Sequence, residues 1–144
     1  MATGRYYLCP QCKTRTWAQS LFYALQDAAY SKAHLCPSCN RDLQLELSFT
    51  FGLDAGTYEY HLVGAYLPEP PVEWNDNNGK KVEFFPFLIV LKHVQSSSKS
   101  VWLPYWHLHH IDEVPRKKYG QWAPHMDMKT FGNLIEKGRK DGHF

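Results

Sequence analysis

Residues 8–12 read Leu-Cys-Pro-Gln-Cys, and residues 35–39 read Leu-Cys-Pro-Ser-Cys. In each copy two residues separate the cysteines, so the chain can curl until both sulfurs face one ion while turn amides hydrogen-bond the thiolates. Two such pairs supply the tetrahedral shell of four sulfurs that structural zinc favours. The repeat therefore predicts one structural Zn²⁺ bound by Cys9, Cys12, Cys36 and Cys39.

The two cysteine pairs resemble those of the zinc-ribbon or rubredoxin-like class over about residues 6–42. The resemblance implies a closed metal site, in which no position is left for a catalytic water. Ribbons often carry glycine directly after each pair, whereas Lys13 and Asn40 stand there in this chain. Asparagine adopts a left-handed conformation more readily than lysine. Iron in place of zinc, redox-active cysteines and free structural thiols are the alternatives.

The composition of the 144 residues suits one domain, or a small metal module fused to a slightly larger one. A hydrophobic content of 44% argues against global disorder, and a net charge of +2 supports a nucleic-acid partner only weakly. The longest apolar stretch, Phe84–Leu91, is far shorter than the ~20 residues of a membrane helix. We expect a soluble, cytoplasmic protein with no membrane partner, and in that compartment paired cysteines hold metal more often than they form disulfides.

The chain is expected to fold as an α+β protein whose N-terminal head, residues 1–42, is a zinc-ribbon-like module. Between the cysteine pairs, apolar residues recur at helical spacing, which predicts a short amphipathic helix inserted in the head. The hydroxyl of Thr14 or Thr16 could cap the start of this helix. The apolar stripe consists of Trp17, Leu21, Leu25 and Ala28.

Residues 43–144 are expected to form a four-stranded antiparallel sheet and a C-terminal helix, packed with the head as one compact unit. Strict alternation of apolar and polar residues predicts the first two strands as a hairpin. The expected strands are 43–51, 57–62, 81–94 and 101–111.

Prolines and asparagines predict the boundaries of these elements. Three prolines and an Asn-Gly pair mark residues 68–79 as an exposed loop. Pro86 implies a bulge or a sheet edge within the third strand, because proline cannot donate a ladder hydrogen bond. Asp127 could cap the last helix, whose stripe includes Phe131, Leu134 and Ile135.

Histidines cluster near the end of the fourth expected strand. His107 and His109 would share one face of a strand, as two metal ligands do, and His125 could complete a second metal site. The alternative is that these histidines are solvated or hydrogen-bonded on the outer face of the sheet.

The same region resembles the HNH nuclease pattern. That resemblance implies His109 or His110 as the general base, with Asn133 and His143 in support and a divalent metal ion. The long gap before Asn133 and the position of His143 next to the C-terminus depart from the family pattern.

A basic and aromatic segment follows the histidines. Cations neutralise phosphates and aromatic faces stack on unpaired bases, so the segment is a candidate nucleic-acid site; an ordinary solvated loop is the alternative. Its residues are Arg116, Lys117, Lys118, Tyr119 and Trp122.

The function predicted from these features is a non-enzymatic zinc-binding module that recognises a macromolecule such as nucleic acid. The alternatives are an adaptor that binds another protein through exposed aromatic residues, and an HNH-like metal-dependent nuclease. The sequence contains no Gly-rich phosphate loop, and no small-molecule substrate is indicated.

Overall fold

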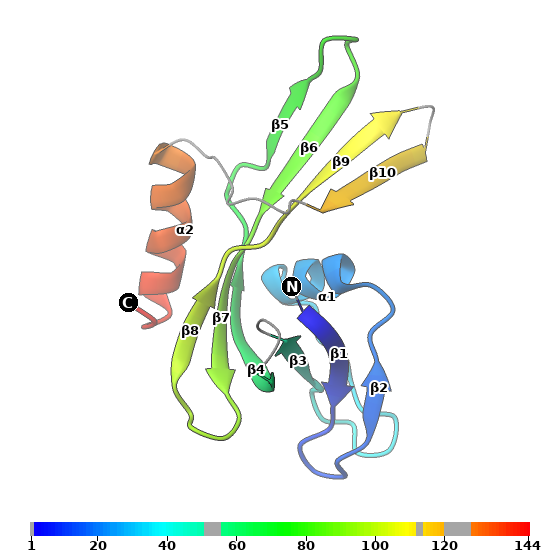
Figure 1. Ribbon diagram of the computed structural model, residues 1–144, viewed down its shortest axis with the longest axis vertical. Helices are drawn as coiled ribbons and strands as arrows, with labels where there is room; N and C mark the ends of the chain where they lie inside the picture. The colour runs from blue at the N-terminus through cyan, green and yellow to red at the C-terminus, as the bar shows by residue number, and fades with distance from the viewer. Residues whose placement is uncertain (1, 51–55, 112–113, 120–127) are drawn as a thin grey trace. The chain divides into compact units, whose positions relative to one another are not determined.

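The computed structural model describes residues 2–50, 56–111, 114–119 and 128–144 (Figure 1). The described chain is α+β, with two helices and with two sheets of six and four strands. Two compact units divide the chain, the first being Met1–Ala65 with Val90–Ser100 and the second Tyr66–Ile89 with Val101–Phe144. The division expected after residue 42 falls within the first unit, where strands from both sides of it pair with each other.

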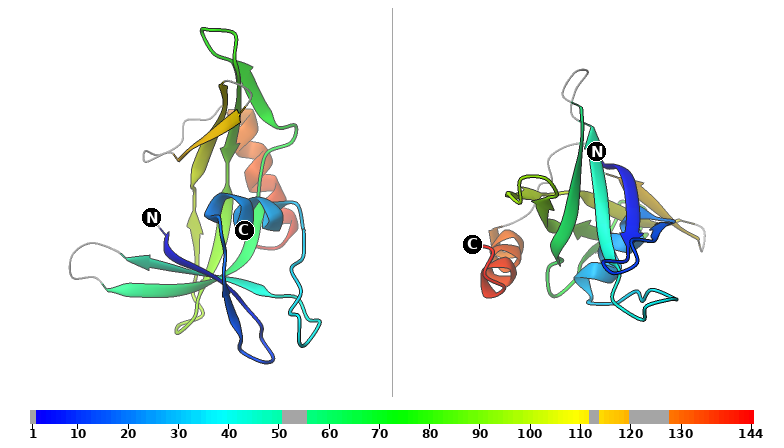
Figure 2. Two further views of the ribbon diagram at one scale, coloured as in Figure 1. Left: turned by 90° about the vertical axis from the view of Figure 1, so that its right-hand side faces the viewer. Right: turned by 90° about the horizontal axis from the view of Figure 1, so that it is seen from below.

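In the six-stranded sheet, the third strand in spatial order has buried residues on both of its faces. Its strands in spatial order are β2 (Arg15–Trp17), β1 (Ala2–Leu8), β3 (Gln44–Thr50), β4 (Thr57–Tyr66), β7 (Leu88–His93) and β8 (Lys99–Trp102). The expected hairpin is confirmed, because β3 and β4 pair antiparallel and lie side by side in both views of Figure 2. In β3 the apolar residues are buried, and so are Glu46 and Ser48 of the alternate set.

The helix expected between the cysteine pairs is confirmed as α1 (Leu21–Ala29). Its N-cap is Ser20, whose hydroxyl accepts a hydrogen bond of 3.3 Å from the backbone N–H of Tyr23. Three side chains of the helix are buried: Phe22, Ala24 and Leu25.

The expected start of this helix is wrong. Thr16 and Trp17 belong to β2, where they pair with Tyr7 and Tyr6 of β1, so the helix begins only after this strand ends. Trp17 is 43% exposed and is not part of the buried helical stripe, and neither Thr14 nor Thr16 is the cap.

The expectation of one four-stranded sheet is also wrong, because both long strands break at a proline. Residues 81–94 divide into β6 (Lys81–Pro86) and β7, and residues 101–111 into β8 and β9 (Tyr105–Ile111). The break is closed by a hydrogen bond of 2.9 Å from the Phe87 N–H to the Pro104 carbonyl. Proline has no N–H for the ladder, so each strand changes sheet at this point.

The second sheet gains two strands that the sequence did not predict. Its order is β10 (Val114–Tyr119), β9, β6 and β5 (Val72–Asn75), and the three pairings are antiparallel. β5 lies within the expected loop at 68–79, and β10 covers most of the basic segment.

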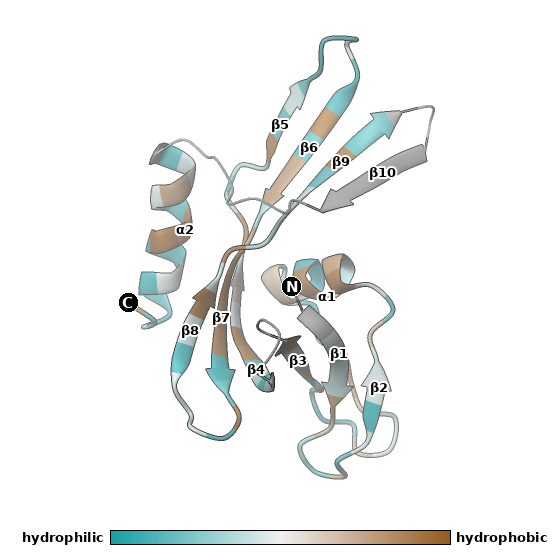
Figure 3. Ribbon diagram, in the orientation of Figure 1, coloured by the Kyte–Doolittle hydropathy of each residue, from teal (hydrophilic) through white to brown (hydrophobic). Residues whose placement is uncertain are grey.

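The C-terminal helix is confirmed as α2 (Met128–Lys140), while its expected cap, Asp127, lies outside the described residues. Leu134 is fully buried, and brown apolar residues on α2 are visible in Figure 3. Lys137 forms an ion pair of 2.8 Å with Glu69 and lowers the pKa of that carboxyl. No helix in the described part of the chain is long and apolar enough to cross a membrane.

Glu46 is a buried carboxylate in the middle of the first sheet. Only 2% of its surface is exposed, and its oxygens lie 2.7 Å from Arg15 Nη2 and 3.5 Å from His61 Nε2. A buried charge is tolerated only when it is paired in this way. The Arg15–Glu46 pair joins β2 to β3 across β1, so it ties the edge of the sheet to its interior.

We expect Glu46→Gln to lower the free energy of unfolding by about 1–2 kcal/mol, because a charge-assisted hydrogen bond becomes a neutral one. Urea denaturation would measure the change. Glu136→Gln is the matched control, because this carboxylate is 55% exposed and lies 3.8 Å from Arg139. This substitution should lower the free energy of unfolding by less than ~0.5 kcal/mol. Equal effects of the two substitutions would contradict the role given to Glu46.

Candidate metal centre

The four cysteines converge on one point. Their Sγ atoms all lie within 4.8 Å of one another, and the Cys12–Cys36 pair is 3.7 Å apart. All four are free thiols. Sulfurs placed tetrahedrally about 2.3 Å from a metal ion are about 3.8 Å apart, so the cluster has the size and the donor atoms of a metal site. Within the described ranges, no other group of three or more Cys, His, Asp or Glu ligands lies this close together.

The two cysteine turns repeat the same backbone hydrogen bonds. In each turn the first cysteine's N–H donates to the carbonyl five residues later, and the N–H four residues later donates back to the cysteine carbonyl. These bonds measure 3.0 and 3.0 Å in the turn of Cys9, and 2.9 and 2.9 Å in the turn of Cys36. The two Leu-Cys-Pro-x-Cys motifs therefore adopt the same backbone turn.

The residue after each pair adopts the left-handed conformation that the sequence suggested. Lys13 has φ of 62° and Asn40 has φ of 53°. Such a conformation is unfavourable for a side chain with a Cβ, and more so for lysine than for asparagine. In each turn the N–H of this residue donates to the carbonyl of the first cysteine, so the left-handed conformation is part of the turn that carries both sulfurs.

Local hydrogen bonds shift the pKa values of the Cys12 and Cys39 thiols in opposite directions. The Thr14 hydroxyl lies 3.1 Å from Cys12 Sγ, and Thr14 lowers the pKa of the Cys12 thiol to about 6 through this contact and its backbone N–H. The pKa of Cys39 is raised to about 12, first by its hydrogen bond with Cys12 and then by burial. One thiolate thus opposes the ionisation of the next, and a metal cation would remove that opposition.

The predicted second metal site is not assembled among the described residues. His107 and His109 are neighbours on β9, with ring centroids 5.9 Å apart, as the alternation of the strand predicts. His107 stacks on Phe84 with centroids 5.0 Å apart and planes 18° apart. His125 lies outside the described residues. A second metal site stays a prediction.

The residues of the HNH hypothesis each have a local contact. His110 Nε2 is 2.7 Å from the Glu83 carboxylate, and Asn133 Oδ1 accepts a hydrogen bond of 3.0 Å from the Glu69 N–H. The ring of His143 packs 6.1 Å from that of Tyr66. None of these contacts joins His110, Asn133 and His143 to one another, and the HNH-like nuclease stays an alternative prediction.

The part of the basic segment that the structure describes is a strand and not a loop. Arg116, Lys117, Lys118 and Tyr119 belong to β10, which pairs with β9 and stands first in the order of the four-stranded sheet. Trp122 lies outside the described residues. The register sets Arg116 opposite His109 and Lys118 opposite His107, so the basic and histidine-rich segments are adjacent.

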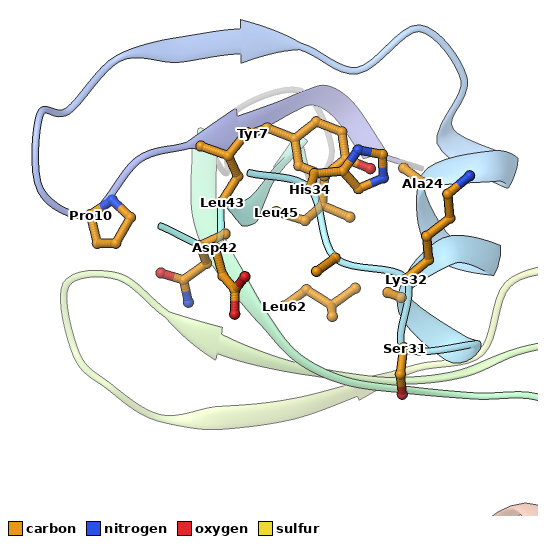
Figure 4. Close-up of a pocket in the computed structure, with 13 residues that line it drawn as sticks. Tyr7, Pro10, Ala24, Ser31, Lys32, His34, Asp42, Leu43, Leu45 and Leu62 are labelled. Atoms are coloured by element: carbon orange, nitrogen blue, oxygen red, sulfur yellow. The ribbon is translucent and has the colours of Figure 1, made fainter. Parts of the chain in front are cut away.

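A cavity of about 470 Å³ opens in the first unit near the second cysteine turn (Figure 4). Leu43, Leu45 and Leu62 form much of its apolar lining. The Tyr7 ring packs on His34, with centroids 4.5 Å apart, and burial raises the pKa of Tyr7. The His34 Nε2 is already 3.0 Å from an Asp27 oxygen, so we assign no ligand to this cavity.

Comparison with protein-family models, curated proteins and solved structures gave no match. The chain is therefore not assigned to the zinc-ribbon class or to any other family. Among the described residues, the cysteine cluster is the arrangement that points most directly to a function, because its donor atoms already lie together.

Lys13→Gly is expected to raise the free energy of unfolding by up to about 1 kcal/mol, because glycine adopts a positive φ without steric cost. Thermal unfolding of the metal-loaded protein would measure this gain. Lys13→Ala is the control, since it removes the same side chain but keeps the Cβ. A gain of equal size from alanine would show that the backbone conformation is not the cause.

Proposed function

We propose that this chain is a non-enzymatic module whose first unit is held together by one structural Zn²⁺ and which recognises nucleic acid. The observation that carries the metal proposal is the convergence of four Sγ atoms within 4.8 Å, from two turns with the same hydrogen bonds. The proposed ligands are Cys9, Cys12, Cys36 and Cys39.

The donor set favours zinc over other metals. Four thiolates in a tetrahedral shell suit zinc or iron, while magnesium and calcium require oxygen ligands. Two Cys-x-x-Cys pairs at about this separation are typical of zinc sites. The site therefore resembles that of a zinc ribbon in its ligands and in its paired turns.

A structural role follows from the closed ligand shell. Four protein ligands leave no position for the water or substrate that a catalytic zinc binds. The turn of Cys9 joins β1 to β2. The segment before Cys36 is connected to the residue before β3 by a hydrogen bond of 2.7 Å from the Leu43 N–H to the His34 carbonyl. One ion would thus fasten two separate segments of the first unit.

Recognition of nucleic acid is supported by the basic residues of the second unit. Arg116, Lys117 and Lys118 are consecutive in β10, at the edge of the four-stranded sheet in the described chain. Lysine and arginine bind phosphates electrostatically and release counterions when they do so. A protein with a net charge of only +2 would need several cations close together, and three of them are consecutive in this strand.

Native mass spectrometry of gently purified protein is expected to show one Zn²⁺ per chain. Cys36→Ser should lose the ion and, with it, several of the ~10–16 kcal/mol by which binding of structural zinc stabilises a folded protein. Circular dichroism during thermal unfolding would record the loss of stability, and a strong chelator should have the same effect on the unaltered protein.

Cys39→His is the matched control for the ligand role, because histidine replaces thiolate in many zinc shells. This variant should keep the ion, whereas Cys39→Ser should not. Gently purified protein that carries no metal and whose four thiols are all alkylated under native conditions would refute the zinc proposal.

A further inference from the structure

Five aromatic rings form a continuous row across three strands of the four-stranded sheet. The three strands, β5, β6 and β9, lie side by side in Figure 1. Phe84 of β6 is opposite His107 of β9, and their rings are stacked. Adjacent ring centroids along the row are 5.0 to 6.1 Å apart. The row consists of Trp74, Phe84, Tyr105, His107 and His109.

The rings of this row differ in their exposure. Trp74 is 44% exposed and both histidines are half-buried, whereas Phe84 is only 8% exposed. Phe84 thus supports its neighbours, and Trp74 is the ring of the row that presents the most surface to a ligand. Rings that are held by other rings lose little conformational freedom when a planar ligand stacks on them.

The alternation of the strands sorts charge between the two faces of this sheet. Glu73 and Glu83 stand opposite each other, at positions alternate to the aromatic row, and Lys81 Nζ lies 3.3 and 3.9 Å from their carboxylates. His110, also at an alternate position, pairs with Glu83. The acids of these strands are therefore on the face away from the rings, and they are already paired.

On β10, the positions opposite the two histidines of the row are occupied by basic residues. The register sets Arg116 opposite His109 and Lys118 opposite His107. The described residues of β5, β6 and β9 that pair with members of the row are not acidic. They are Val72, Val82 and Pro86, besides the members of the row themselves. A ligand that matches this face needs negative charge and planar aromatic groups together.

We propose that this face binds single-stranded nucleic acid, with a base stacked on Trp74 and with phosphates held by Arg116 and Lys118. Single strands present base faces and phosphates at once, while a duplex hides the faces of its bases. The inference rests on the proposed recognition of nucleic acid and specifies its substrate class and its residues.

The test is a fluorescence anisotropy titration of the metal-loaded protein against a labelled oligothymidylate of about 12 nucleotides, within the range of single-strand binding sites. A duplex of the same length is the competing probe. The single strand should bind at least tenfold more tightly than the duplex. Its affinity should fall as salt rises, with a slope that drops by about 0.7 in Lys118→Ala. Lys92→Ala, which removes an exposed lysine of β7, should leave the slope unchanged.

Trp74→Ala should weaken binding about tenfold, which corresponds to about 1.4 kcal/mol, while Trp74→Phe should stay within about threefold because it keeps a ring. Trp17→Ala is the matched control, since Trp17 is 43% exposed against 44% for Trp74 and lies in the first unit. Each variant is first compared with the unaltered protein in thermal unfolding and in zinc content.

Three results would separate the possible failures. Equal affinity for single strand and duplex, or unchanged affinity of a stably folded Trp74→Ala variant, would overturn the stacking surface and leave nucleic-acid recognition standing. Failure of metal-loaded protein to bind either probe would overturn both and favour a protein partner. A lack of zinc would contradict only the metal proposal, because it is measured independently of binding.

Discussion

Four sulfur atoms from two turns distant in the sequence lie within 4.8 Å of one another, which brings two separate segments of the first unit to one point. Thiolates this close repel each other through their like charges. A divalent cation converts the repulsion into attraction. Structural zinc binds with about 10–16 kcal/mol, against a typical net stability of about 5–15 kcal/mol for a whole protein. A single ion would therefore decide whether the two turns stay together.

The cysteine turns are coupled to the sheet through the backbone. The first turn connects β1 to β2, and β1 pairs with β3 along its length. The second turn is closed by a bridge between Leu35 and Asp42, just before β3 begins. Because β3 is buried on both faces, neither turn can move far without disturbing the interior of the unit. The metal site and the core of the sheet are in this sense one structure.

The cysteine cluster and the hairpin could be predicted from the sequence because both depend on local patterns. A pair of cysteines two residues apart and a period of two over residues 43–49 specify their geometry without distant partners. The division of the sheets could not be predicted in this way. Pro86 marks a break in a ladder, but whether a strand bends, ends or enters another sheet there depends on its neighbours, here the hydrogen bond from Phe87 to Pro104.

The second unit is harder to predict from its sequence than the first, because its side chains meet partners from strands that are distant in the sequence. The alternation of β9 correctly places His107 and His109 on one face, and from the sequence alone two such histidines suggest metal ligands. Their neighbours come from β5 and β6, whose register is not visible in the sequence. A metal site needs a third donor within a few ångströms, whereas a stacking surface needs rings side by side. In the described residues His107 has Phe84, Tyr105 and Trp74 around it, and this environment favours stacking.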